Sequence, residues 1–193
     1  TFKMSLLNSK KTLVKATITT AIAATAMSSF AAKYNWTIQS GAQAGDSFFS
    51  IQQEWAKRVG VMSNGEIDIS LVPVNSIVAY NETLDAVGAG IIQGHIADPS
   101  YFSGKDPAFA MLGNLVGAWS NPSQMIGFIE YGGGKEVYNE LVNPYGLQFI
   151  GAASTGVESF VSKRPIRSVE DFKGIKMRAP EGMVQEVFAA VGA

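Results

Sequence analysis

The chain has 193 residues, of which 47% are hydrophobic and 16% are charged, with no cysteine and a formal net charge of -1. This composition excludes a disordered chain, a disulfide scaffold and a lipid-modified N-terminal cysteine. The near-neutral charge provides no basic surface for a nucleic-acid partner, so we expect a globular protein that binds something else.

The first predicted element is a secretory signal peptide over residues 1–31. Lys10, Lys11 and Lys15 lead into a small, apolar run from Ala16 to Met27, and small residues at Ser29 and Ala31 suit cleavage after Ala31. The run is shorter than the roughly 20 apolar residues that a membrane-spanning helix needs. We therefore expect export to the periplasm without a lipid anchor.

The following residues predict a β-α-β unit. Residues 34–39 and 67–71 alternate apolar and polar side chains, as strands do, and Asp46 can cap a helix that ends at Asn64-Gly65. Such units favour parallel strands with helices packed on the sheet. The apolar residues of this helix recur at steps of three and four, and the face expected to be buried consists of Phe48, Ile51, Trp55, Val59 and Met62.

Strands and helices continue to alternate to the end of the chain, which predicts the α/β fold class. Asn121 can cap a helix with Pro122 at its first position, and residues 168–171 form a capping box for one short turn that stops at Gly174. Residues 176–178 are expected to be extended. Further helices are expected near 82–87, 135–142 and 183–191, and further strands near 95–97, 147–152 and 158–162.

In open α/β sheets, ligands bind at the carboxyl ends of the strands. A ligand site is therefore expected among the segments that follow the predicted strands. These segments are residues 40–45, 74–80, 98–104, 153–156 and 178–182.

The residues offer no constellation for catalysis. Gly132-Gly133-Gly134-Lys135 lacks the first glycine of a phosphate loop, and Glu136 stands where Ser or Thr should follow, so these glycines are expected to separate two helices. His95 is the only histidine, and without cysteine it supports neither a transition-metal site nor a catalytic triad. We expect His95 to be packed in a strand and the protein not to be an enzyme.

Three residues are candidates for binding a ligand. Arg178 ends a short extended segment before a proline, and its planar guanidinium matches a carboxylate with two parallel hydrogen bonds. Tyr101 and Phe102 follow a predicted strand, where aromatic rings can wall a pocket. The alternatives are a surface arginine and two aromatic rings packed under a loop.

Residues 165–180 read PIRSVEDFKGIKMRAP. This segment is the strongest match by which the chain, from about Trp36 onward, resembles the solute-binding proteins of tripartite ATP-independent periplasmic (TRAP) transporters, the dicarboxylate-binding protein family. The segments at 98–102 and 104–109 are most similar to the branch that binds α-keto acids and related monocarboxylates. Supporting matches lie at residues 71–73, 84–87 and 188–193, and at Gly90.

The resemblance implies a two-domain fold of the periplasmic-binding-protein type that closes around its ligand. Residues 32–154 would form the first domain, and residues 155–193 the start of a truncated second domain. The implied function is to capture a small organic carboxylate in the periplasm, an α-keto acid or a related mono- or dicarboxylate, and to deliver it to the membrane subunits of a TRAP transporter. An extracytoplasmic ligand sensor for a signalling receptor is the alternative.

The resemblance also assigns roles to individual residues. The family's selectivity-determining arginine falls on Arg178, and Tyr101 and Phe102 would cover the ligand, with Thr155 a further site residue. A second site position falls on Glu158, whose carboxylate would repel a bound carboxylate unless a cation or a ligand donor lies between them. The hypothesis is that Glu158 contacts a cation such as sodium or a ligand donor; otherwise it faces solvent or pairs with Lys163. No other cofactor is implied.

Overall fold

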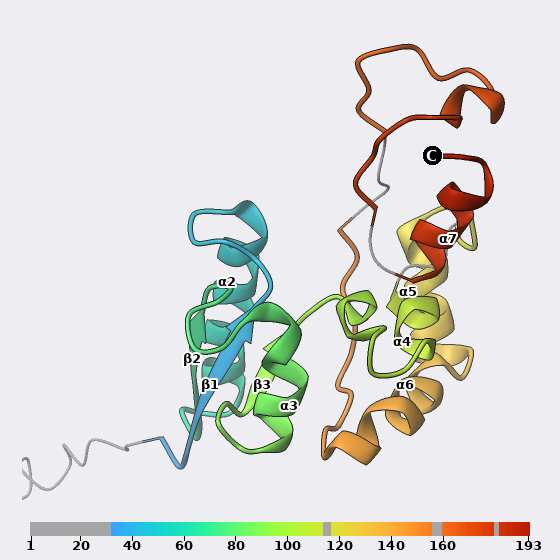
Figure 1. Ribbon diagram of the computed structural model, residues 1–193. Coiled ribbons are helices and arrows are strands. Elements are labelled where there is room, and N and C mark those ends of the chain that lie inside the picture. Colours follow the sequence, from blue (N-terminus) through green and yellow to red (C-terminus); the bar gives the residue numbers. More distant parts are fainter. Residues whose placement is uncertain (1–31, 114–116, 156–159, 180–181) are drawn as a thin grey trace, which may run out of the picture.

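The structure is a computed structural model that describes residues 32–113, 117–155, 160–179 and 182–193 (Figure 1). The predicted signal peptide lies outside these residues. Within them, no helix has both the length and the apolar character needed to cross a membrane.

A parallel three-stranded sheet forms the first part of the fold, as the β-α-β pattern predicts. Strands β1 (Tyr34–Ser40), β2 (Ile67–Val72) and β3 (Gly94–Ile96) are ordered β2-β1-β3. Both neighbours of β1 run parallel to it, with Ile38 opposite Leu71 on β2 and Gly94 on β3. The carboxyl ends of all three strands therefore lie at one edge of the sheet.

Helix α2 (Ser47–Met62) connects β1 to β2 and begins and ends as predicted. The Asp46 carboxylate accepts a hydrogen bond from the Phe48 amide at 2.9 Å, and the chain leaves the helix through Asn64 and Gly65, both at positive φ.

The predicted buried face of α2 is wrong. Phe49 and Ala56 are buried, whereas Ile51 is 64% exposed and Met62 is 86% exposed. The physical reason is that α2 carries apolar residues around much of its circumference, so that spacing alone allows two faces. Phe48 and Trp55, from the face that was expected to be buried, are also exposed.

The main core lies where three helices of the first part meet. Helix α3 (Thr83–Gly88) follows a 3-10 turn over Tyr80–Glu82, and α4 (Ala108–Gly113) follows a second 3-10 turn over Pro99–Phe102. Helix α6 (Gly134–Val142) packs beside α4 (Figure 1). The core side chains are Leu84, Phe102, Phe109 and Val142.

Helix α5 (Pro122–Tyr131) begins as predicted, because the Asn121 side chain accepts a hydrogen bond from the Gln124 amide at 3.1 Å. Glycines separate α5 from α6, as expected. Gly133 has φ 86°, a conformation that glycine adopts without strain. A third 3-10 turn, Asn143–Tyr145, follows α6.

The later strand predictions do not hold. Residues 147–152 and 160–162 have no regular structure, while 158 and 159 lie outside the described residues. A strand needs a partner for its backbone hydrogen bonds, and the described sheet contains only β1, β2 and β3. Lys176–Arg178 has no strand partner in that sheet either.

The end of the chain forms a short turn and one helix. The predicted turn is the 3-10 segment Glu170–Phe172, where the Asp171 carboxylate accepts hydrogen bonds from the amides of Arg167 and Ser168. Three rings gather beside this turn, with every pair of centroids 5.4 Å apart: Phe160, Phe172 and Phe188.

Helix α7 (Met183–Ala190) packs against α4 of the first part (Figure 1). Gly182 precedes α7 at φ 85°, and a Cβ there would stand 2.7 Å from the Cβ of Ala110. The domain boundary between residues 154 and 155 stays a prediction.

Candidate functional site

An open cavity of about 460 Å³ lies beyond the carboxyl ends of the strands. Three of the segments expected to surround a ligand line it: the loop after β2, the turn after β3 and the end of the extended segment at Arg178. The lining residues are Asn75, Ala79, Tyr80, Asn81, Ser100, Tyr101, Arg178 and Ala179.

The loop after β2 is fixed by a buried glutamine on β1. Gln39 is fully buried, and its side-chain oxygen accepts hydrogen bonds from the amides of Ile77 at 2.9 Å and Val78 at 3.2 Å. Its side-chain nitrogen donates to the Val78 carbonyl at 2.9 Å. Since every polar atom of the Gln39 amide has a partner, the sheet holds this wall of the cavity rigidly.

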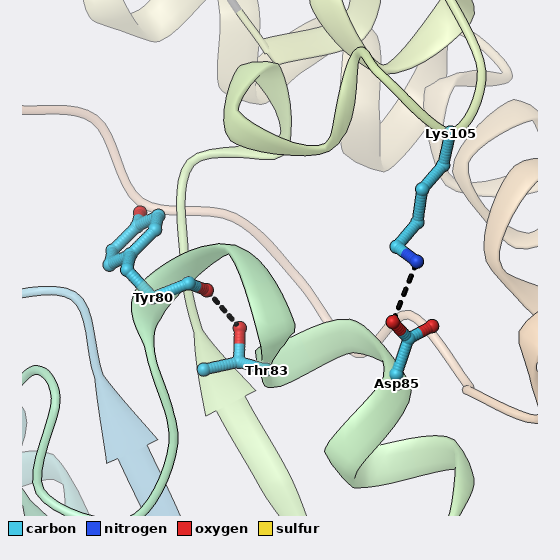
Figure 2. Close-up of polar contacts among 4 residues, drawn as sticks. All are labelled: Tyr80, Thr83, Asp85 and Lys105. Carbon is cyan, nitrogen blue, oxygen red and sulfur yellow. Dashed lines mark hydrogen bonds and ion pairs between the residues drawn. The ribbon is translucent and has the colours of Figure 1, made fainter.

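Tyr80 is the most constrained of the lining residues. Its amide donates to the Asn75 side chain at 2.9 Å, and its carbonyl accepts from the Thr83 hydroxyl at 2.9 Å (Figure 2). Its phenol oxygen accepts from the Asp98 amide at 2.7 Å. Burial raises the pKa of Tyr80 to about 12, so the phenol is protonated at neutral pH.

The turn that carries Tyr101 is closed by Asp98. One oxygen of its carboxylate accepts hydrogen bonds from the amide of Ser100 at 2.9 Å and from its hydroxyl at 2.7 Å. Tyr101 is 42% exposed, and its ring centroid lies 4.4 Å from that of Tyr80. The two rings form an aromatic wall for the cavity.

Arg178 reaches this wall from the far end of the sequence. Its Nη2 donates a hydrogen bond to the Tyr101 hydroxyl at 2.8 Å. Of the described residues that line the cavity, Arg178 alone carries a charge. The others contribute amide, hydroxyl and methyl groups, so the cavity offers a single cationic anchor among neutral donors.

The other predicted site residues have different outcomes. Phe102 does not cover the cavity: it is 3% exposed and packs between Phe109 and the ring of His95. Side chains of successive residues in a tight turn point apart, which sends Tyr101 to the cavity and Phe102 to the core. Thr155 is exposed and is not among the described lining residues, and Glu158 lies outside the described part of the chain.

His95 is packed in a strand, as expected, and does not act as a ligand in the described site. Its Nδ1 lies 2.8 Å from the hydroxyl of Thr83. Burial lowers the pKa of His95 to about 4, which keeps the ring neutral. In the described ranges, no three residues of His, Cys, Asp or Glu gather as metal ligands.

An ion pair connects the segment after the turn that bears Tyr101 to α3. Lys105, after the turn that bears Tyr101, lies 2.6 Å from the carboxylate of Asp85 on α3 (Figure 2). Gly113 on α4 allows a close approach from the other side, since a Cβ there would stand 2.6 Å from the amide of Ser100. The turn is thus held against both α3 and α4.

Sequence reasoning missed Tyr80, Asn75 and Asn81 as lining residues. Tyr80 lay within a segment that was expected to border the site, but nothing in the spacing distinguished it from its neighbours. The glycine at position 41 is related to Tyr80, because a Cβ there would stand 2.4 Å from the Tyr80 ring. The sequence alone does not show this contact.

Comparison with known proteins gives consistent matches. Residues 40–193 match the DctP family, described as bacterial extracellular solute-binding protein, family 7. The chain is 33% identical over 138 residues to a monocarboxylate 2-oxoacid-binding periplasmic protein of Nostoc sp., a match that covers 71% of this chain and 37% of that protein.

Two solved structures extend the comparison. A TRAP periplasmic solute-binding protein from Rhodobacter sphaeroides, in an apo open form, is 55% identical with a TM-score of 0.70, over 83% of this chain and 51% of that one. Another from Pseudoalteromonas atlantica, with bound sodium and pyruvate, is 31% identical with a TM-score of 0.69, over 83% and 49%.

The chain spans about half the length of these solved relatives. The resemblance read from the sequence and the α/β fold of the periplasmic-binding-protein type are both confirmed. With four-fifths of its length matched and the parallel sheet in place, the chain belongs to family 7 of the bacterial extracellular solute-binding proteins, the DctP family.

Proposed function

We propose that this protein is the periplasmic solute-binding subunit of a TRAP transporter and that it captures a small monocarboxylate of the 2-oxo acid class. Two relatives support the ligand class, one named for monocarboxylate 2-oxoacids and one solved with pyruvate. In this role the protein binds its ligand, closes and delivers it to the membrane subunits without chemical turnover. The comparisons give no support to the alternative of a ligand sensor.

The observation that carries the proposal is the isolated charge of Arg178 in the cavity. A guanidinium binds a carboxylate through two parallel N–H···O bonds, and these bonds strengthen when water is excluded. Among the described lining residues Arg178 alone is cationic, so this part of the site offers one positive charge to one ligand carboxylate.

Domain closure supplies the exclusion of water. Arg178 is exposed here, and Tyr101 and Tyr80 approach it from the first part of the chain. A ligand that contacts Arg178 and the tyrosine wall at once stabilises the arrangement in which Arg178 and Tyr101 lie together.

A cation beside the ligand is part of the proposal. One relative was solved with sodium and pyruvate, and another, from Colwellia psychrerythraea, with calcium and pyruvate. In this chain Glu158 is the residue proposed to contact such a cation. The test is to measure pyruvate binding in choline chloride, and again after addition of sodium or calcium.

Thermal unfolding of the full-length protein tests the ligand class. A ligand at about 100 times its Kd raises the free energy of unfolding by about 2.7 kcal/mol, which appears as a higher melting temperature. We expect a rise with pyruvate and other 2-oxo monocarboxylates, and none with sugars or with pyruvamide, which lacks the negative charge. A rise with sugars alone would refute the proposed class.

Substitutions of Arg178 test its role. Arg178→Ala is expected to cost about 2–5 kcal/mol of binding free energy. Arg178→Lys keeps the charge but loses the planar guanidinium that makes two parallel hydrogen bonds to a carboxylate. It is expected to cost about 1.5–3 kcal/mol of binding free energy, the value of one charged hydrogen bond. Arg58→Ala is the matched control, because Arg58 is exposed on α2, where it pairs with Glu54 and does not line the described cavity. Unchanged pyruvate binding by Arg178→Ala would show that Arg178 is not the anchor.

A further inference from the structure

Tyr80 contacts Asn75, Thr83, Asp98 and Tyr101, although no sequence motif marks it. We propose that Tyr80 is a positioning residue: it fixes Tyr101, and through Tyr101 it fixes the guanidinium of Arg178 before the ligand arrives. The inference rests on the proposed function, because the guanidinium is its carboxylate anchor.

The first step of the argument is that Tyr80 itself cannot easily move. Its backbone amide donates a hydrogen bond to the Asn75 side chain. Its backbone carbonyl accepts one from the Thr83 hydroxyl, as Figure 2 shows. Its ring lies against the backbone of Gly41, where even a methyl group would stand 2.4 Å from a ring carbon. Asn75 has φ 59°, a backbone conformation that asparagine tolerates better than most residues. In this conformation its side-chain oxygen accepts the hydrogen bond from the Tyr80 amide.

The second step is that Tyr80 fixes Tyr101 by two routes. Its ring lies 4.4 Å from the Tyr101 ring, centroid to centroid, at an interplanar angle of 59°. Its phenol oxygen also accepts the amide hydrogen of Asp98, the residue whose carboxylate closes the turn that bears Tyr101. Tyr80 therefore supports both the side chain and the backbone of Tyr101.

The third step is that Arg178 depends on Tyr101. The Tyr101 hydroxyl is the only hydrogen-bond partner of the Arg178 guanidinium among the described residues. The segment around Arg178 has no strand partner in the described sheet. A long side chain without such a contact would have to be ordered by the ligand, and that ordering lowers affinity.

A thermodynamic cycle on pyruvate binding tests the proposal, measured by calorimetry on the full-length protein. Tyr80→Leu is expected to weaken pyruvate binding about tenfold, or about 1.4 kcal/mol. If Tyr80 acts through the Tyr101 hydroxyl, the same substitution should have no further effect once Tyr101→Phe has removed that hydroxyl. Tyr80→Phe keeps the ring contact and should recover part of the loss.

Two further variants separate positioning from general damage to the fold. Tyr131→Leu is the matched control, because Tyr131 is 92% exposed on α5. This variant should bind pyruvate as the wild type does. Gly41→Ala displaces the Tyr80 ring while the tyrosine itself stays in the sequence. This variant should weaken pyruvate binding as Tyr80→Leu does. Gly41→Ala decides the question if Tyr80→Leu does not fold.

The outcomes distinguish this inference from the proposed function. Wild-type affinity in Tyr80→Leu, or in Gly41→Ala where Tyr80→Leu does not fold, overturns the positioning role. So does a loss that persists undiminished in the Tyr101→Phe background. If the wild type does not bind pyruvate, or if Arg178→Ala binds it equally well, the proposed function fails first, and the positioning role fails with it.

Discussion

Replacing His95 by glutamine should remove a pH dependence of stability that the fold itself creates. The Thr83 hydroxyl has one hydrogen, which it donates to the Tyr80 carbonyl, so the Nδ1 of His95 must be the donor to the Thr83 oxygen. A proton taken up by the ring would therefore enter at Nε2. The centroid of the His95 ring lies 5.5 Å from that of the buried Phe102 ring. Burial there lowers the pKa of His95 from 6.5 to about 4.

The sign and size of the effect follow from these two pKa values. Between pH 6.5 and 4 the unfolded chain binds a proton at His95 that the folded chain does not, so stability falls as the pH falls through this window. From pH 7.5 to 5.5 the loss is about 1.3 kcal/mol by proton linkage. Because this range stays above the folded pKa, the loss is set almost entirely by the unfolded-state value.

Urea unfolding followed by tryptophan fluorescence at pH 7.5 and 5.5 measures the effect. The wild type should lose about 1.3 kcal/mol more than His95→Gln over this range. The difference between the two proteins isolates His95 from every other titrating group. Equal losses in the wild type and the variant would show that the imidazole titrates alike in both states, and the argument from burial would be wrong.

Two further substitutions test the packing around the site. Phe109→Ala removes a ring that is 1% exposed at the centre of the main core, and should lower the free energy of unfolding by about 3–5 kcal/mol in the same urea assay; a loss below 1 kcal/mol would mean that the core repacks. Lys105→Met breaks the partly exposed pair with Asp85 and should cost less than about 1 kcal/mol, with the difference shrinking in 1 M salt; a salt-independent loss would point to packing by the lysine stem.

The local structure near the strands could be predicted because the signals were local. Asp46 and Asn121 cap their helices by contacts that span two or three residues, and the alternation at residues 34–39 and 67–71 matches β1 and β2. Placing the cavity also needed only a general property of parallel sheets. Each of these predictions used interactions that the nearby sequence determines.

What the sequence could not give was the choice between equivalent faces and the contacts between distant residues. Periodicity allowed two buried faces for α2, and only packing on the sheet selects Phe49 and Ala56. Phe102 and Tyr101 are adjacent and both aromatic. Which of the two is buried in the core and which lines the cavity depends on the direction of the turn that carries them. The bond between Tyr101 and Arg178 joins residues 77 positions apart, which no local pattern encodes.

The glycine before α7 sets a limit on how this protein can change. Gly182 lies four residues beyond Arg178, at a φ that side chains disfavour, and against Ala110 at a distance that leaves no room for a methyl group. Larger residues at either position would push α7 away from α4. Neither position is among the described residues that line the cavity, so a search for variants that alter ligand affinity should extend to this packing contact.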